Sequence, residues 1–200
     1  VAVPEAIRTA TFPAEPTMTK LADGVYAFER RDYKSIAVEF PTIIAVFEAP
    51  RNEDFNLRVT DAIAKLIPNK PIRFIVNSHQ HFDAIGGLRA YHHIGATLVT
   101  SFHNFDLYKH DVINYAARTK HPDMVSQWPP TELAEGYNYE TVRENYVIED
   151  GGRLMRMLYM NPLQHAEGML VAYLPKEKVI FQGDFSVNPG QPANDHVRAL

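Results

Sequence analysis

The sequence predicts one domain of mixed α/β structure, and three observations indicate this class. The chain has 200 residues, a length that fits a single domain. Hydrophobic residues make up 46% of it, enough for a sizeable buried core. Short runs rich in β-branched and aromatic residues alternate with segments whose apolar residues recur at helical spacing.

The first part of the chain predicts an arm, a strand meander and a helix. Residues 1–20 contain three prolines and show no periodicity, so we expect an extended N-terminal arm. Short runs of Val, Ile, Phe and Tyr then predict three strands, at residues 24–29, 35–40 and 42–48. Asn52 begins a helix-start signal, apolar residues follow at helical spacing, and Pro68 ends the predicted helix.

The middle of the chain predicts a strand–helix–strand unit. Residues 72–77 have the composition of a buried strand, and a polar loop follows them. A helical segment then extends through His93, where Gly95 caps it, and residues 96–100 form the next predicted strand.

The last part of the chain predicts one more helix, a loop and two hairpins. We expect a helix over residues 104–117 and a proline-rich loop over residues 120–136. The remaining strands pair across polar turns, residues 139–148 with 153–160 and residues 169–174 with 178–182.

Composition excludes several classes of function. The chain has no Cys, which rules out disulfides, thiolate zinc fingers, iron–sulfur clusters and Cys nucleophiles. Its net charge of -4, with both signs mixed, gives no basic footprint for nucleic acid. No apolar run approaches the ~18 residues of a membrane span, so we expect neither nucleic acid nor membrane as partner. The motifs of serine hydrolases, P-loop proteins and dinucleotide enzymes are also missing from the sequence.

The strongest chemical signal lies where the predicted strand over residues 72–77 ends. His79, His81 and Asp83 alternate there, and residues two apart at a strand end point to the same side. Imidazole suits Zn, Fe, Ni or Cu, and a carboxylate widens that range. The spacing therefore predicts a metal site, against the alternative of exposed polar residues in a strand–helix loop.

Two later residues are candidates to complete such a site. His165 lies in a loop between two predicted strands, and Asp184 follows a strand and Gly183. Each residue alone has an ordinary explanation, as a surface His and as a turn former. Because strand-end loops on one edge of a sheet converge, we expect these two side chains to join the earlier three.

In these motifs the chain resembles the metallo-β-lactamase superfamily. The matching segments, in the family's order, are VNSHQHFDAIGG at residues 76–87, HAEGMLVAYLP at residues 165–175 and FQGD at residues 181–184. The resemblance covers residues 21–200 and implies a four-layer αββα sandwich over them. It also implies that His79, His81 and His165 hold the first metal ion.

The chain departs from the family pattern at the second metal site. Ala84 stands where that site has a His, and a methyl group cannot bind a metal. Asp83 and Asp184 match the carboxylates of the second site, whereas its final His has no counterpart before Leu200. We therefore expect one zinc ion, a weak or missing second ion, and a natural chain that continues past Leu200. Iron or manganese is compatible with the same ligands.

The resemblance implies a metal-dependent hydrolase in which metal-bound hydroxide attacks a lactam, lactone or ester carbonyl. Asp83 and Asp184 are the expected catalytic carboxylates. An alternative is a non-catalytic or weakly active relative that keeps the fold and one metal for ligand binding or stability. Di-iron enzymes that reduce oxygen or nitric oxide also share the resemblance, but they usually carry Glu where His81 stands and a fused flavin domain.

The expected partner is a small-molecule substrate, and a homo-oligomer is compatible with the sequence. Location stays open between the periplasm or exterior, after signal removal, and the cytoplasm.

Overall fold

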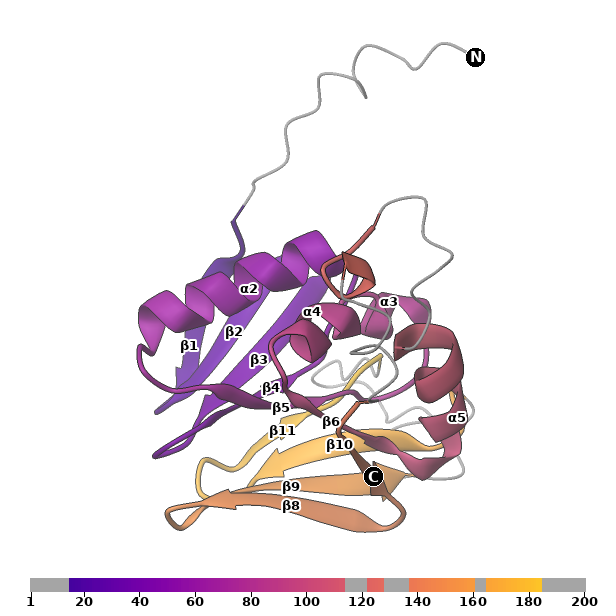
Figure 1. The fold of residues 1–200 in the computed structure, drawn as a ribbon. Helices are drawn as coiled ribbons and strands as arrows, with labels where there is room; N and C mark the ends of the chain where they lie inside the picture. The colour runs from indigo at the N-terminus through magenta and orange to yellow at the C-terminus, as the bar shows by residue number, and fades with distance from the viewer. Residues whose placement is uncertain (1–14, 114–121, 128–136, 161–164, 185–200) are drawn as a thin grey trace.

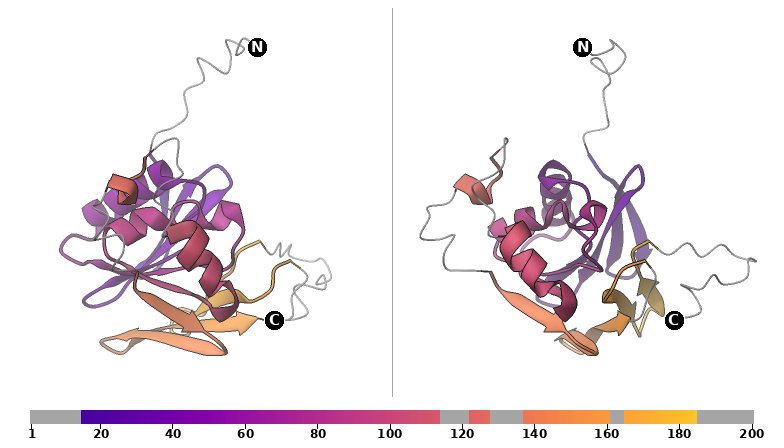
Figure 2. Two further views of the ribbon diagram at one scale, coloured as in Figure 1. Left: turned by 45° about the vertical axis from the view of Figure 1, so that its right-hand side comes forward. Right: turned by 90° about the vertical axis from the view of Figure 1, so that its right-hand side faces the viewer.

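Two stacked β-sheets with helices on the outer face of the larger one make up the fold (Figure 1). It is seen in a computed structural model, which describes residues 15–113, 122–127, 137–160 and 165–184. The two further views show the same layers from the side, with the smaller sheet beneath the larger (Figure 2).

The larger sheet, sheet A, has seven strands that follow one another in chain order. The first four form an antiparallel meander, and the last four strands pair in parallel. Parallel pairing brings the carboxyl ends of β5 and β6 to the same edge. The strands are β1 (Thr17–Ala22), β2 (Val25–Arg30), β3 (Tyr33–Glu39), β4 (Ile44–Phe47), β5 (Ile72–Val76), β6 (Thr97–Ser101) and β7 (Tyr139–Val142).

The smaller sheet, sheet B, has four antiparallel strands in the order β11-β10-β9-β8. Its strands are β8 (Asn145–Asp150), β9 (Arg153–Met160), β10 (Met169–Leu174) and β11 (Val179–Phe181). Residues 165–168, ahead of β10, and the end of β11 lie at the edge where β5 and β6 end, since Gly168 adjoins Ser101 and Gly183 adjoins Ser78.

Short helical segments accompany the sheets. Asn52 begins α2, because its side chain accepts a hydrogen bond from Phe55 N at 3.1 Å. No helix in the part of the chain that the structure describes is long and apolar enough to cross a membrane. The helical elements are α2 (Glu53–Leu66), α3 (Phe82–Ile85), α4 (Leu88–His93), α5 (Phe105–Leu107), the 3-10 helices η1 (Phe102–Asn104) and η3 (Val125–Gln127), and the π-helix η2 (Tyr108–Ile113).

Apolar side chains form two buried layers, one on each face of sheet A. Strand β4 shows why, since all four of its residues are buried. Ala45 and Phe47 face sheet B, and Ile44 and Val46 face α2 and α4. This alternation explains why β4 is apolar at every position instead of at every second one.

The predicted mixed α/β class, the meander, the strand–helix–strand unit and the hairpin of β10 with β11 are all confirmed. The prediction of one strand over residues 139–148 is wrong, because β7 and β8 belong to different sheets. Exposed Arg143 and Glu144 separate them. Strand β7 pairs with β6, which lies about 40 residues earlier, and this long-range partner has no signature in the local sequence.

Three further boundaries differ from the prediction. Thr17–Lys20, expected in the arm, belong to β1, and residues 1–14 lie outside the described residues. Helix α3 begins at Phe82, ahead of the two glycines. The helix expected over residues 104–117 consists of short α and π pieces up to Ile113, and its remainder lies outside the described residues, as does most of the loop at residues 120–136.

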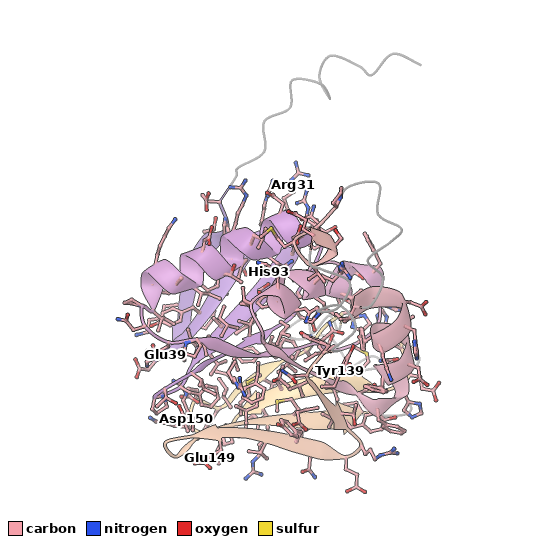
Figure 3. All side chains as sticks on the ribbon, in the orientation of Figure 1. Arg31, Glu39, His93, Tyr139, Glu149 and Asp150 are labelled. Carbon is pink, nitrogen blue, oxygen red and sulfur yellow. The ribbon has the colours of Figure 1, made fainter. Side chains whose placement is uncertain are left out.

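Arg153 joins the two sheets at the end opposite β5's carboxyl terminus. Its guanidinium donates to Glu39 O at 2.6 Å, to Asp23 O at 2.7 Å and to Glu177 Oε1 at 2.8 Å. Asp150 adds a second tie through the backbone and hydroxyl of Thr42. Figure 3 shows Glu39 and Asp150 at this shared end.

We predict that Arg153→Met lowers the free energy of unfolding by about 2–4 kcal/mol, because it leaves a buried carboxylate and two carbonyls without their donor. Urea denaturation measures this change. The control is Lys20→Met, which removes an exposed pair with Asp23 and is expected to change stability by less than about 0.5 kcal/mol. Equal effects of the two variants on the free energy of unfolding would contradict the role of Arg153 in joining the two sheets.

Candidate metal centre

Three loops bring four possible metal ligands together at one edge of the sandwich. His79 and His81 follow β5, His165 precedes β10, and Asp184 follows β11. One donor atom from each of the four lies within 4.8 Å of the donors of the others. Residues far apart in the sequence thus meet at the carboxyl end of the parallel strands, where open α/β sheets place their sites.

The distances within this cluster are those of donors that share one ion. Asp184 Oδ2 lies 2.9 Å from His165 Nε2, 3.1 Å from His79 Nε2 and 4.0 Å from His81 Nδ1. The two Nε2 atoms are 3.4 Å apart. The three imidazole rings stand edge to face, with interplanar angles of 66° to 79°.

The donor set fits a tetrahedral transition-metal ion. Four donors that each lie ~2.1 Å from a central zinc are ~3.4 Å from one another, and three of the measured separations are within about half an ångström of that value. Imidazole and carboxylate are ligands for zinc, and imidazole also suits iron. Nitrogen lone pairs directed at one point repel each other unless a cation or proton lies between them.

Burial prepares His79 for this role. His79 is 1% exposed, and this burial lowers the pKa of its imidazole, with His81 and His165 acting in the same direction and Asp184 opposing. A lowered pKa keeps the ring neutral, which is the form that binds metals. Ser78 Oγ lies 2.7 Å from His79 Nδ1, so in the tautomer protonated at Nδ1 the Nε2 lone pair is free for an ion.

The loop that carries His79 and His81 is pressed against the end of β4. Arg51 N donates to Asp83 O at 3.0 Å, and Gly87 N donates to Ala49 O at 2.9 Å. A Cβ on Gly86 would lie 2.0 Å from Arg51 O, and one on Gly87 would lie 1.8 Å from the Asn56 amide nitrogen. Gly86 is therefore required by close packing on the backbone after β4, and Gly87 by close packing on the buried Asn56 side chain of α2.

Strained backbone surrounds the cluster. Glu48, Arg51 and Asp184 all have left-handed φ angles, of 70°, 71° and 55°. Such angles cost a residue with a side chain ~1–3 kcal/mol and tend to occur at functional sites. Gly183 precedes Asp184, and a Cβ there would lie 2.6 Å from Ser78 Oγ, so glycine allows the chain to approach His79.

Glu48 is a buried carboxyl group beneath the cluster. Its Oε1 accepts a hydrogen bond from Ser78 N at 2.7 Å, and its Oε2 accepts one from Asn77 Nδ2 at 3.3 Å. Burial, with a smaller contribution from the charges of Asp184 and Asp83, raises the pKa of Glu48 from its ordinary 4.5 to about 8, although the hydrogen bonds from Ser78 act in the opposite direction. In the metal-free protein this group is therefore mostly the neutral acid at pH 7.

Asp83 lies apart from the four clustered donors. Its side chain lines a pocket of about 160 Å³ that His79 and Asp184 also border. Ala84 lies in the same wall, and the turn between β2 and β3 closes the other side with Asp32 and Tyr33. The structure thus brings His79, His81, His165 and Asp184 together, and it places Asp83 in the space next to them.

Sequence reasoning missed Glu48, Asn77 and Ser78 as parts of the site. All three are buried polar residues at the ends of the buried strands β4 and β5. A polar residue that directly follows an apolar strand was the available signal.

The sequence matches the family model described as "Metallo-beta-lactamase superfamily" over residues 48–198. The chain belongs to this superfamily. The match includes all four clustered donors and Asp83. No curated protein matches the chain.

Solved metallo-β-lactamase structures share the fold at low sequence identity. An enzyme from Pontibacter korlensis has a TM-score of 0.60 at 19% identity, with 84% of this chain and 71% of that one covered. MEM-A1, a subclass B3 enzyme from a soil metagenome library, has a TM-score of 0.59 at 17% identity, with 80% and 58% covered. A Cronobacter sakazakii metallo-β-lactamase with a HARLDQ motif has a TM-score of 0.61 at 18% identity, with 92% of this chain and 68% of that one covered. This likeness establishes the fold.

We predict that Glu48→Gln flattens the pH dependence of stability in the metal-free protein. The pKa of Glu48 is higher in the folded chain, about 8, than its ordinary 4.5. The stabilisation that the protonated Glu48 side chain adds to the folded protein is therefore fully present below pH 4.5. It is lost as the pH rises toward 8, by up to ~1.4 kcal/mol per pH unit. Urea denaturation of both proteins in chelator from pH 5 to pH 8 measures the difference.

The glutamine amide keeps the size of the side chain and an oxygen for Ser78 N. If the amide changes the free energy of unfolding by a constant amount, the curve of that free energy against pH shifts as a whole and keeps its slope. Parallel curves for the two proteins would contradict the raised pKa of Glu48.

Proposed function

We propose that this chain is a hydrolase that binds one divalent transition-metal ion through His79, His81 and His165, with Asp184 as the fourth ligand. The observation that carries the proposal is the meeting of these four donors at tetrahedral separations. Membership of the metallo-β-lactamase superfamily supports hydrolysis as the reaction type. Zinc is the ion we propose, with iron or manganese as the alternatives.

The ion would supply a Lewis acid and lower the pKa of a coordinated water toward ~7. His79 is enclosed, whereas the side chains of His81, His165 and Asp184 are 41%, 28% and 34% exposed, so the cluster is reached from its solvent side. Asp184 would hold the ion with one carboxylate oxygen and could accept a hydrogen bond from the attacking water with the other.

Asp83 is the residue we assign to proton transfer. Its carboxylate lies in the pocket that adjoins the cluster, and Asp83 lies in the exposed part of the loop. A carboxylate in that place takes the proton of the attacking water and passes it to the leaving group. The substrates we propose are small molecules with a lactam, lactone or ester carbonyl.

A second candidate is a non-catalytic relative that keeps one metal for stability or ligand binding. Two observations favour it. Ala84 provides no second-site donor, and four protein donors around one ion resemble the closed shell of a structural metal site.

We predict that the purified protein binds one equivalent of zinc and that His165→Ala abolishes this binding at micromolar protein. The variant removes one of the four donors, and the two imidazoles and one carboxylate that remain no longer surround the ion. Elemental analysis after dialysis measures the content. The control is His110→Ala, an exposed histidine on η2, which is expected to keep one equivalent.

Ala84→His is expected to raise the content toward two equivalents, because it adds an imidazole beside the carboxylates of Asp83 and Asp184. Wild-type protein without stoichiometric zinc, iron or manganese would overturn the proposed function. A second equivalent in the wild type would overturn the single-ion site.

We predict that the zinc-loaded protein hydrolyses at least one chromogenic lactam, lactone or ester, and that Asp83→Asn lowers kcat by about 100-fold. The metal content of this variant stays at one equivalent, because Asp83 lies outside the cluster. The matched control is Asp61→Asn on the exposed side of α2. Metal binding without any turnover would favour the second candidate, and an unchanged kcat in Asp83→Asn would remove that residue from the mechanism.

A further inference from the structure

A buried chain of hydrogen bonds connects η2 to the loop that carries His79 and His81. Tyr108, the first residue of η2, is 0% exposed, and its hydroxyl donates to Asn77 Oδ1. Burial raises the pKa of Tyr108 far above its ordinary value, so the hydroxyl keeps the proton that it donates. Neither residue lines the pocket beside the cluster.

The bond from Tyr108 helps to hold the Asn77 amide in one orientation. With Oδ1 facing the tyrosine, Nδ2 faces the loop and donates to Ala84 O at 3.0 Å and to Glu48 Oε2 at 3.3 Å. A reversed amide would bring its oxygen against the carbonyl oxygen of Ala84, which has no proton to donate. The carbonyl of Ala84 requires this orientation, and the bond from the Tyr108 hydroxyl to Oδ1 holds a side chain that is itself 0% exposed in it.

The Asn77 amide spans the base of the metal loop. Asn77 precedes His79 by two residues, and Ala84 follows His81 by three, so the bond from Nδ2 to Ala84 O closes the loop around both histidines. Glu48 holds the same base from below through Ser78 N. The Asn77 amide is thus the side-chain group that joins the two ends of the loop.

We propose that Tyr108 is a positioning residue for the metal ligands, acting through Asn77 to hold the loop of residues 77–84 in the shape that directs His79 and His81 at one point. The inference rests on the proposed metal binding. Tyr108 lies in a π-helical turn. Such turns are rare in proteins overall but are often found at functional sites, which agrees with this role. Tyr108 comes from an element that contributes none of the four donors.

The test compares two fully buried tyrosines. Tyr108→Phe removes the bond to Asn77, and Tyr91→Phe removes an equally buried hydroxyl on α4, whose partner is Ser35 on β3. We expect zinc affinity, measured by competition with a chromogenic chelator, to fall about 10-fold or more in Tyr108→Phe. In Tyr91→Phe we expect a change of less than about twofold.

A mutant cycle with Asn77→Ala separates positioning from general loss of stability. Because Tyr108 acts through Asn77, Tyr108→Phe is expected to leave zinc affinity unchanged in the Asn77→Ala background. Cobalt-loaded Tyr108→Phe is also expected to show an altered visible spectrum, which reports ligand geometry and not stability. Additive losses in the cycle, or equal affinities of the two Tyr→Phe variants, would overturn the inference.

A measurement on the wild type keeps the inference testable if Tyr108→Phe does not fold. Coupling is reciprocal, so zinc binding must protect the segment from Phe105 to Ile113 against amide hydrogen exchange as well as the loop itself. Protection confined to residues 77–84 would overturn the inference. Absence of any zinc binding by the wild type is a different result, which overturns the proposed function.

Discussion

Ser78 ties the two sheets together at the edge where the metal ligands gather. Its N–H donates to the buried Glu48 at the end of β4, and its carbonyl accepts from Leu170 N at the start of β10. Its hydroxyl contacts the first histidine of the cluster. One residue thereby fixes the position of His79 relative to sheet A and to the strand that His165 precedes. These bonds hold the two halves of the ligand set, His79 with His81 and His165, in fixed positions relative to each other.

The ends of the sandwich differ in what their polar groups do. At the far end, Arg153 donates to two carbonyls and a carboxylate, and Asp150 accepts from the backbone and hydroxyl of Thr42, so their charges are satisfied by the protein itself. At the metal edge, three imidazole nitrogens and a carboxylate oxygen face one another. Left-handed backbone at Glu48 and Asp184 adds strain there. Possible metal donors and strain gathered at one edge are the usual mark of a site that binds something.

Local patterns in the sequence predict the parts of this structure that local forces determine. Alternation at a strand end places His79 and His81 on one side, and the buried strands predict where the loops meet. The meeting of the four donors can therefore be predicted from the sequence. The structure brings the four donors together, while their role as ligands stays a prediction. The hydrogen bonds that join Asn77 to Glu48 and to Tyr108 link residues 29 and 31 positions apart in the sequence. Strand β7 pairs with β6 across about 40 residues. Such contacts depend on tertiary packing and leave no periodic signal.

The central claim is that three imidazoles and one carboxylate hold a single ion. X-ray absorption at the zinc edge of the protein loaded with one equivalent tests it directly. The account predicts three imidazole nitrogens at ~2.0–2.1 Å and one carboxylate oxygen at ~2.0–2.2 Å, with a water oxygen as the further ligand that hydrolysis requires. Fewer than three imidazoles around the ion, or a second metal at ~3.5–4 Å from it, would contradict the account.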